Sequence, residues 1–208
     1  MTSEKKLIPA AAVRGIATGM FMMAAFTMMW AGITFGSLNG KTVAYFLLFL
    51  FAVFAGAFIV NAISLFRIAK HYPKLTSEAD IAERKKMGKW FGIIFGAEGL
   101  GIFIAVNVVI NLGYADLSIP VIALVVGLHF YPMAKIFKRT IDYYLATWTT
   151  IVAIIAILLI LNKVLAVNYA DAFVGVSTAI ATSSYGTYMM ISGWKINKPE
   201  ANEAKLSA

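Results

Sequence analysis

The chain has 208 residues, of which 61% are hydrophobic and 13% charged, and it contains no cysteine. A soluble domain carries about 25% charged residues, so a soluble fold is excluded because a core of this size could not bury so much apolar surface. The lack of cysteine also excludes disulfides, thiolate metal sites and cysteine nucleophiles. The net charge is +8, and the placement of the basic residues is more informative than their number.

Six stretches are apolar for long enough to cross a bilayer. A membrane-spanning helix needs about 20 mainly apolar residues, and a helix is required because lipid offers the backbone no hydrogen-bond partners. We therefore predict an all-α, polytopic integral membrane bundle of six transmembrane helices, arranged as three antiparallel hairpins. The expected spans are residues 9–35, 42–66, 89–110, 117–134, 141–164 and 170–194.

The basic residues predict the orientation of this bundle. With the N-terminus in the cytoplasm, Lys41 and Lys163 are the two of the 18 basic residues that fall on the outer side. This positive-inside distribution predicts that both termini are cytoplasmic and that the protein is a multi-pass protein of the cell (cytoplasmic) membrane. Because the basic charge follows membrane topology, it does not indicate nucleic-acid binding.

The longest cytoplasmic connection follows the second span. Ser77, with Asp80 three residues later, is typical of a helix N-terminus, and Arg84, Lys85 and Lys86 come at the other end. We predict a short cytoplasmic helix over residues 77–87 that leads into the third span. Its basic end either touches anionic lipid headgroups or is simply solvated. We expect the tail, residues 195–208, to be flexible and residues 1–208 to form a single transmembrane domain.

Polar groups within the expected spans are the candidates for function, because they are costly in lipid. At about 1.5 Å per residue, they lie at a similar depth inside the cytoplasmic edge, and every span contributes one of them. We predict a polar cavity in the cytoplasmic half, with Glu98 and His129 at its centre. The candidate substrate-binding or proton-binding residues are Glu98, His129, Asn61, Arg14, Tyr185 and Thr147.

Glu98 and His129 are expected to meet, since adjacent antiparallel spans bring residues of equal depth together. Burial disfavours the charged form of each group, and pairing favours it, so either effect suits the two residues to proton movement. The alternative is a neutral hydrogen-bonded pair that fixes the register of two helices. Arg14 has an alternative of its own, because a long basic side chain near the edge can extend to the headgroups.

The third span also carries glycines at a spacing that lets helix backbones approach closely. We expect this stripe to pack on another helix of the same chain, with packing on a second subunit, a homodimer, as the alternative. Its members are Gly88, Gly92, Gly96 and Gly99.

The function predicted from these features is transport or conduction of a small molecule or ion, coupled to protons through Glu98. Two alternatives stay open: a non-catalytic binding or accessory subunit, and an intramembrane enzyme that uses Glu98 and His129 as acid and base. Soluble-enzyme motifs are absent, so we favour a protein that is not an enzyme. The methionines of the first span are typical apolar filler, so we expect no metal and no cofactor, and the lipid bilayer and a small substrate as partners.

Overall fold

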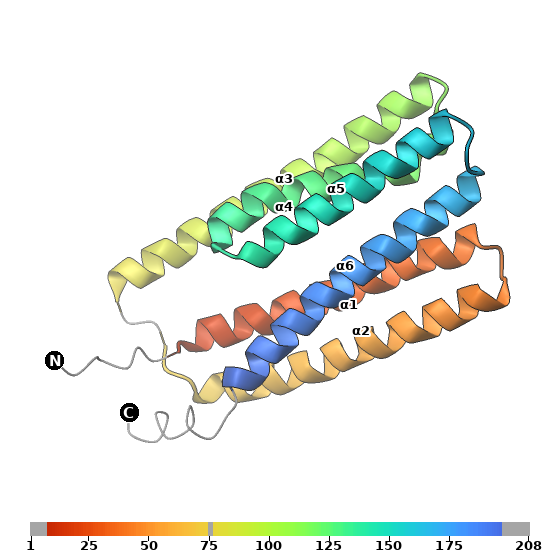
Figure 1. Ribbon diagram of the computed structural model, residues 1–208. Coiled ribbons are helices and arrows are strands. Elements are labelled where there is room, and N and C mark those ends of the chain that lie inside the picture. The colour runs from red at the N-terminus through yellow and green to blue at the C-terminus, as the bar shows by residue number, and fades with distance from the viewer. Residues whose placement is uncertain (1–7, 75–76, 197–208) are drawn as a thin grey trace.

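The computed structural model describes residues 8–74 and 77–196, and in these residues the chain forms six long α-helices and two short 3-10 helices. The helices run up and down, so that both ends of the described chain, the α2–α3 connection and the α4–α5 turn lie together (Figure 1). We call this end of the bundle the basic end, because basic residues such as Lys138 and Lys195 lie there. The elements are α1 (Ala10–Ser37), α2 (Thr42–Ile68), η1 (Ala69–His71), α3 (Glu78–Asn111), η2 (Ala115–Leu117), α4 (Ser118–Phe137), α5 (Thr140–Leu161) and α6 (Val167–Ile196).

The all-α membrane bundle predicted from the sequence is confirmed, with one difference between the helices. Helices α1 to α5 are long and apolar enough to cross a membrane. Helix α6 is 30 residues long but is rich in serine, threonine and glycine. It can be less apolar because it contacts α1, α2, α4 and α5 and has more buried residues than any other helix. Much of its surface therefore faces protein instead of lipid.

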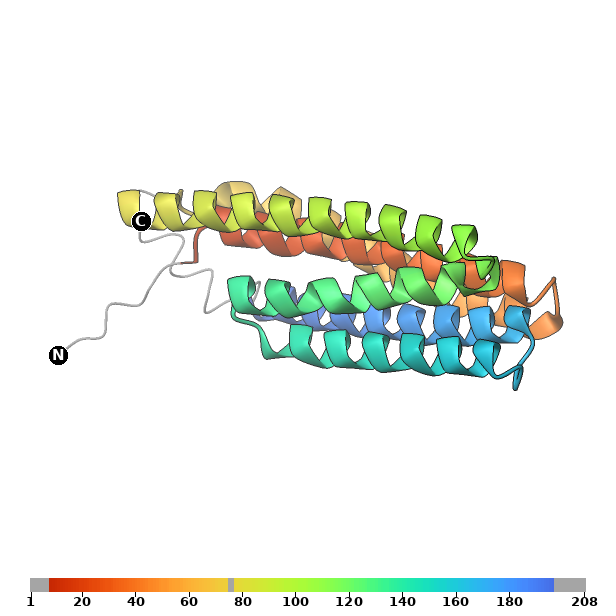
Figure 2. The same ribbon diagram turned by 90° about the horizontal axis from the view of Figure 1, so that it is seen from above.

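The helices form two groups that meet along α6 (Figures 1 and 2). Helices α1, α2 and α6 pack against one another, and in the second group α4 packs against both α3 and α5. Helix α6 joins the groups because it also packs against α5 and α4. Helix α3 lies at the edge, packs mainly on α4, and has no buried residue.

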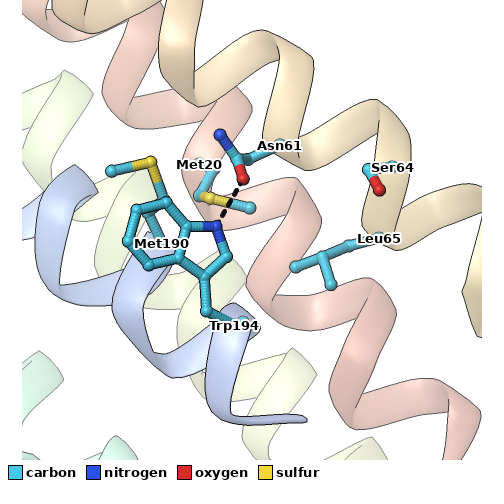
Figure 3. Close-up of a pocket in the computed structure, with 7 residues that line it drawn as sticks. Met20, Asn61, Ser64, Leu65, Met190 and Trp194 are labelled. Atoms are coloured by element: carbon cyan, nitrogen blue, oxygen red, sulfur yellow. Dashed lines mark hydrogen bonds between the residues drawn. The ribbon is translucent and has the colours of Figure 1, made fainter. Parts of the chain in front are cut away.

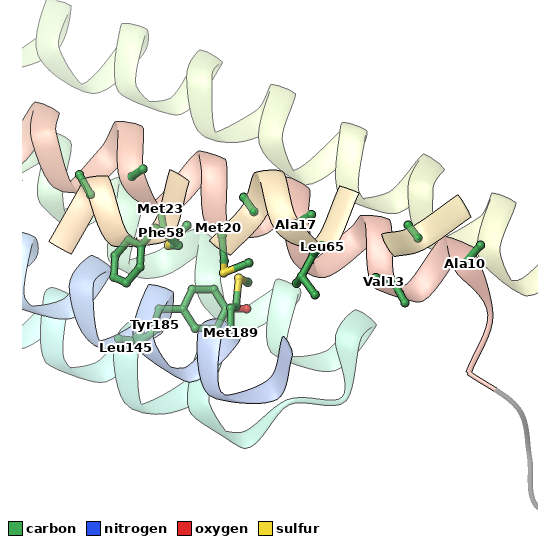
Figure 4. Close-up of a cluster of buried hydrophobic side chains, with 14 of the residues drawn as sticks. Ala10, Val13, Ala17, Met20, Met23, Phe58, Leu65, Leu145, Tyr185 and Met189 are labelled. Carbon is green, nitrogen blue, oxygen red and sulfur yellow. The ribbon is translucent and has the colours of Figure 1, made fainter. Parts of the chain in front are cut away.

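The core of the first group is built from side chains of α1, α2 and α6 (Figure 4). Met20, Phe58 and Met189 fill the space where small residues such as Ala17 and Ala62 let the helices approach. Large apolar side chains point outward instead, as a lipid solvent requires. Phe46, Phe49 and Phe103 are examples, each more than 60% exposed.

The prediction that the glycines of the third span pack within the chain is wrong. A Cβ atom added at Gly88, Gly92, Gly96 or Gly99 would meet no atom of the described residues within 4 Å. Sequence spacing shows that residues share a face of a helix, but it does not show which way that face points. Helix α3 packs through its opposite face, so the glycine stripe faces outward.

The glycines that allow close approach lie elsewhere. A Cβ atom at Gly175 would be 2.4 Å from Thr34 Oγ1, and at Gly186 it would be 2.3 Å from the ring of Phe58. At Gly127 it would be 2.6 Å from Thr150 Oγ1. These positions bring α6 against α1 and α2, and α4 against α5.

The short cytoplasmic helix predicted over residues 77–87 is not separate from the third span. Both are part of α3, which begins after Ser77, whose hydroxyl accepts from the N–H of Asp80. The segment contains no proline, and Gly88 alone costs a helix only about 1 kcal/mol. At about 1.5 Å per residue, its 34 residues reach about 50 Å, so α3 extends beyond roughly 30 Å of hydrocarbon. The predicted flexible tail lies outside the described residues, apart from Lys195 and Ile196 at the end of α6.

Candidate functional site

Glu98 and His129 lie together between α3 and α4. The Oε1 atom of Glu98 is 3.3 Å from Nδ1 of His129, and each side chain is 11% exposed. The two helices are antiparallel neighbours, and Glu98 lies on the face of α3 that packs against α4. The hairpin therefore places a carboxyl group and an imidazole in contact within the apolar part of the molecule.

The contact has the distance of an ion pair but not the angle of a good hydrogen bond, since Nδ1 of His129 is buried without a hydrogen-bond partner of standard geometry. The pair can be neutral, with a protonated acid beside a neutral imidazole, or ionic, with the proton on the imidazole. Burial favours the first state and mutual attraction favours the second. Two interacting groups of this kind titrate as a unit. Both states hold one proton and are neutral overall, so uptake of a second proton or loss of the first changes the net charge of the pair by one.

Thr147 lies apart from the pair and bonds to Tyr131 across the α4–α5 interface. The hydroxyl oxygens of Tyr131 and Thr147 are 3.1 Å apart. The aromatic ring of Phe130, between Tyr131 and His129 in the chain, lies 4.2 Å from the imidazole, measured between ring centroids. The second half of α4 thus presents polar groups to both neighbouring helices.

Asn61 is part of a second polar contact, between α2 and α6. Its Oδ1 accepts a hydrogen bond of 2.8 Å from Nε1 of Trp194, and its Nδ2 donates to the carbonyl of Ala57. These residues line a small pocket with an empty volume of about 230 Å³, part of it open to the surroundings (Figure 3). The enclosed part has room for about one water molecule. The pocket is lined by Met20, Asn61, Ser64, Leu65, Met190, Gly193 and Trp194, and neither Glu98 nor His129 reaches it.

Arg14 and Tyr185 occupy two further places. Arg14 is exposed on α1, where a long basic side chain can reach the headgroup layer. Tyr185 is buried on α6, and its hydroxyl accepts a hydrogen bond of 3.1 Å from Nη1 of Arg139. Among the six sequence-predicted residues, Glu98 and His129 are the two that touch one another. Asn61, Thr147 and Tyr185 bond to other partners, and Arg14 is exposed.

Asp142 is a buried acid that the sequence analysis did not select. Asp142 is 1% exposed. Its carboxylate interacts electrostatically with the hydroxyl of Tyr185 and with the charge of Arg139. Its two oxygens make no hydrogen bond of standard geometry, so the Tyr185 contact is a loose one. A carboxylate between Ile141 and Tyr143, inside an expected span, was the available signal.

Within residues 8–74 and 77–196, no three acidic, histidine or cysteine side chains lie close enough together to hold a metal ion. Comparison of the chain with protein-family models, curated proteins and solved structures finds no match.

Proposed function

We propose that this protein is a small transporter of the cytoplasmic membrane in which the Glu98–His129 pair binds the proton that drives movement of a small molecule or ion. The contact of 3.3 Å between the two side chains is the observation that carries the proposal. An ionisable group within a membrane span is costly, and such groups mark substrate or proton pathways by default.

The position of α3 supports this role for the pair. Helix α3 packs mainly on α4 and has no buried residue, so few contacts oppose its displacement. Glu98 lies on the packed face, where a change in the charge of the pair alters the attraction between α3 and α4. Proton binding is thereby linked to the position of a peripheral helix, as coupled transport requires. Arg14, Asn61, Thr147 and Tyr185 are proposed as polar groups along the route of the substrate.

The test is proton flux into proteoliposomes under an imposed pH gradient, followed with an enclosed pH-sensitive dye. Wild-type protein is expected to carry protons, and Glu98→Gln, which keeps the shape of the side chain and removes its charge, is expected to abolish the flux. Glu83→Gln is the matched control, because Glu83 is an exposed acid on the basic-end extension of the same helix. Equal flux in wild type and Glu98→Gln, or no flux in wild type, contradicts the proposal.

A non-catalytic accessory subunit is the second candidate, and the outward glycine stripe of α3 favours it. A face without side chains lets a helix of another protein approach closely, and a Cβ atom added at any glycine of the stripe would meet nothing within 4 Å in the described part of the chain. Native electrophoresis of solubilised membranes tests this role. Gly92→Leu is expected to release the chain from a larger complex, and Gly15→Leu, at an equally open position on α1, is expected not to. Migration of the wild type as a single copy excludes the role.

A further inference from the structure

The two helix groups are joined at the basic end by three polar residues. Arg139 comes directly before α5, Asp142 lies in the first turn of α5, and Tyr185 belongs to α6. Nη1 of Arg139 donates to the hydroxyl of Tyr185 at 3.1 Å, and the carboxylate of Asp142 lies near that hydroxyl without a hydrogen bond of standard geometry. Tyr185 therefore links α6, from one group, to the start of α5, from the other.

Two of the three residues are buried, and Arg139 is half-buried beside an aromatic ring. Asp142 and Tyr185 are 1% and 5% exposed. The guanidinium carbon of Arg139 lies 5.0 Å from the centre of the Phe137 ring, at the end of α4. Arg139 makes no salt bridge within 4 Å among the described residues, so its attraction to Asp142 acts through space and through the Tyr185 hydroxyl.

This burial makes the junction sensitive to separation of the two groups. A carboxylate without partners in an apolar environment is costly, and a buried hydroxyl without a partner is also unfavourable. In the closed arrangement, Arg139 and Tyr185 compensate Asp142. When α6 moves away from α5, Asp142 keeps the nearby charge of Arg139 but loses the hydroxyl of Tyr185, and this part of the compensation is lost unless water enters. A partly separated junction is therefore less stable than either of two other states. One is closed and contains no water, and the other is open and solvated by water.

The junction lies next to the Glu98–His129 pair. The ring of Phe130 makes an edge-to-face contact with Tyr185, with centroids 6.2 Å apart, and the same ring lies 4.2 Å from the imidazole of His129. One aromatic side chain therefore touches both polar groups, and a shift of α4 at His129 reaches Tyr185 directly.

We infer that Arg139, Tyr185 and Asp142 form a polar latch that holds the two helix groups together and closes the cytoplasmic side of the bundle. The latch goes beyond the proposed transport function: it assigns the place where the molecule opens, and its test does not depend on any solute. Tyr185 is a positioning residue in this device, because its hydrogen bond with Arg139 joins α6 to the start of α5.

Because the chain contains no cysteine, spin labels attach only to introduced cysteines, and the distance between two labels can be measured without background labelling. Lys135→Cys on α4 and Lys195→Cys on α6 place two exposed labels on different groups at the basic end. Val43→Cys and Val164→Cys provide a reference pair at the opposite end, where both residues are at least 50% exposed. Pulsed electron paramagnetic resonance of the labelled protein in nanodiscs reports each distance.

Tyr185→Phe is the main variant, because it keeps the ring and removes the hydroxyl that accepts from Arg139 across the contact between α5 and α6. The basic-end distance is expected to lengthen and broaden, while the distance at the opposite end stays as in wild type. Tyr188→Phe is the control, since Tyr188 stacks on Tyr185 and is half-exposed on the same helix. Its distances are expected to equal those of wild type.

Asp142→Asn tests the charge separately and is expected to lengthen the same distance. Tyr185→Phe changes no volume in the core, so it keeps the inference testable if Asp142→Asn fails to fold. Wild-type distances in Tyr185→Phe overturn the latch. If the basic-end distance lengthens in Tyr185→Phe but the wild-type protein carries no protons, the latch is supported and the transport proposal is contradicted. If the wild-type protein carries protons but the distance is unchanged in Tyr185→Phe, the transport proposal is supported and the latch is contradicted.

Discussion

The side chain of Thr27 on α1 donates a hydrogen bond of 2.9 Å to the hydroxyl of Thr182 on α6, at a fully buried position. The Thr182 hydroxyl in turn lies 3.1 Å from the carbonyls of Thr178 and Ala179. The bond crosses the contact between the first helix and the central helix. Removal of this bond therefore measures how much a hydrogen bond, as opposed to close packing, stabilises the interface between α1 and α6.

Thr27→Val removes this bond and keeps the shape of the side chain. Interhelical hydrogen bonds in membranes contribute about 0.6 kcal/mol on average, so we expect the free energy of unfolding to fall by less than about 1 kcal/mol. Unfolding in mixed micelles, with a double-mutant cycle to Thr182→Val, measures the coupling between the two hydroxyls. A loss of several kcal/mol would show that the hydroxyls have a larger structural role than the geometry indicates.

Gly175→Ala is expected to be more harmful than loss of that hydrogen bond. The new methyl group would lie 2.4 Å from Thr34 Oγ1 and 3.0 Å from the backbone nitrogen of Thr34 and the carbonyl oxygen of Trp30. Because backbone atoms cannot move aside as a flexible side chain can, α1 and α6 must separate. Overpacking of this kind costs about 1–3 kcal/mol, and the midpoint of thermal unfolding in detergent should fall accordingly.

Gly92→Ala is the matched control for that substitution. It is not expected to lower the midpoint of thermal unfolding, whereas Gly175→Ala is. Gly92 meets nothing within 4 Å, and alanine is favoured over glycine in a helix by about 1 kcal/mol. The control should leave the unfolding midpoint unchanged or raise it. A fall as large as that of Gly175→Ala would mean that the glycine stripe of α3 is packed after all.

These two glycines show where sequence reasoning succeeded and where it stopped. The spacing of Gly88, Gly92 and Gly96 placed them correctly on one face of a helix, but the rotation of that helix depends on what α4 presents to it. Glu98 and His129 were expected to meet because their depths follow from span boundaries and neighbouring spans are antiparallel, and both facts come from chain order. The sequence analysis did not select Gly175, although Gly175, Ala179 and Ser183 are small residues at a spacing of four, so its close contact with Thr34 was not predicted.

The place of α6 and the burial of Asp142 escaped the sequence for a related reason. A helix with many hydroxyl groups has low hydropathy, which by itself suggests an exposed or marginal span. In the structure the same composition serves a helix surrounded by four others. Asp142 lies near the start of an expected span, and only the packing of Tyr185 and Arg139 near it distinguishes a buried acid from a solvated one.

The indole of Trp194 offers a spectroscopic test of the α2–α6 contact. The chain has four tryptophans, so a nitrogen-15 correlation spectrum should show four indole signals. Asn61→Leu removes the acceptor of Trp194 Nε1, and the proton signal of that indole should move upfield because a hydrogen-bonded proton resonates downfield. The signal of Trp148, whose Nε1 donates to the carbonyl of Ser177, is the internal control and should not move. A spectrum unchanged by Asn61→Leu would contradict the contact.

The orientation of the bundle can be tested with single cysteines. Lys138→Cys lies in the α4–α5 turn at the basic end, and Asn162→Cys lies in the α5–α6 connection at the opposite end, and both positions are exposed. Because basic residues are retained on the cytoplasmic side, a membrane-impermeant maleimide added to intact cells should label Asn162→Cys. It should label Lys138→Cys only after the membrane is permeabilised. The reverse pattern would place the Arg139–Tyr185–Asp142 latch on the outer face, so that it would close the bundle against the exterior and not against the cytoplasm.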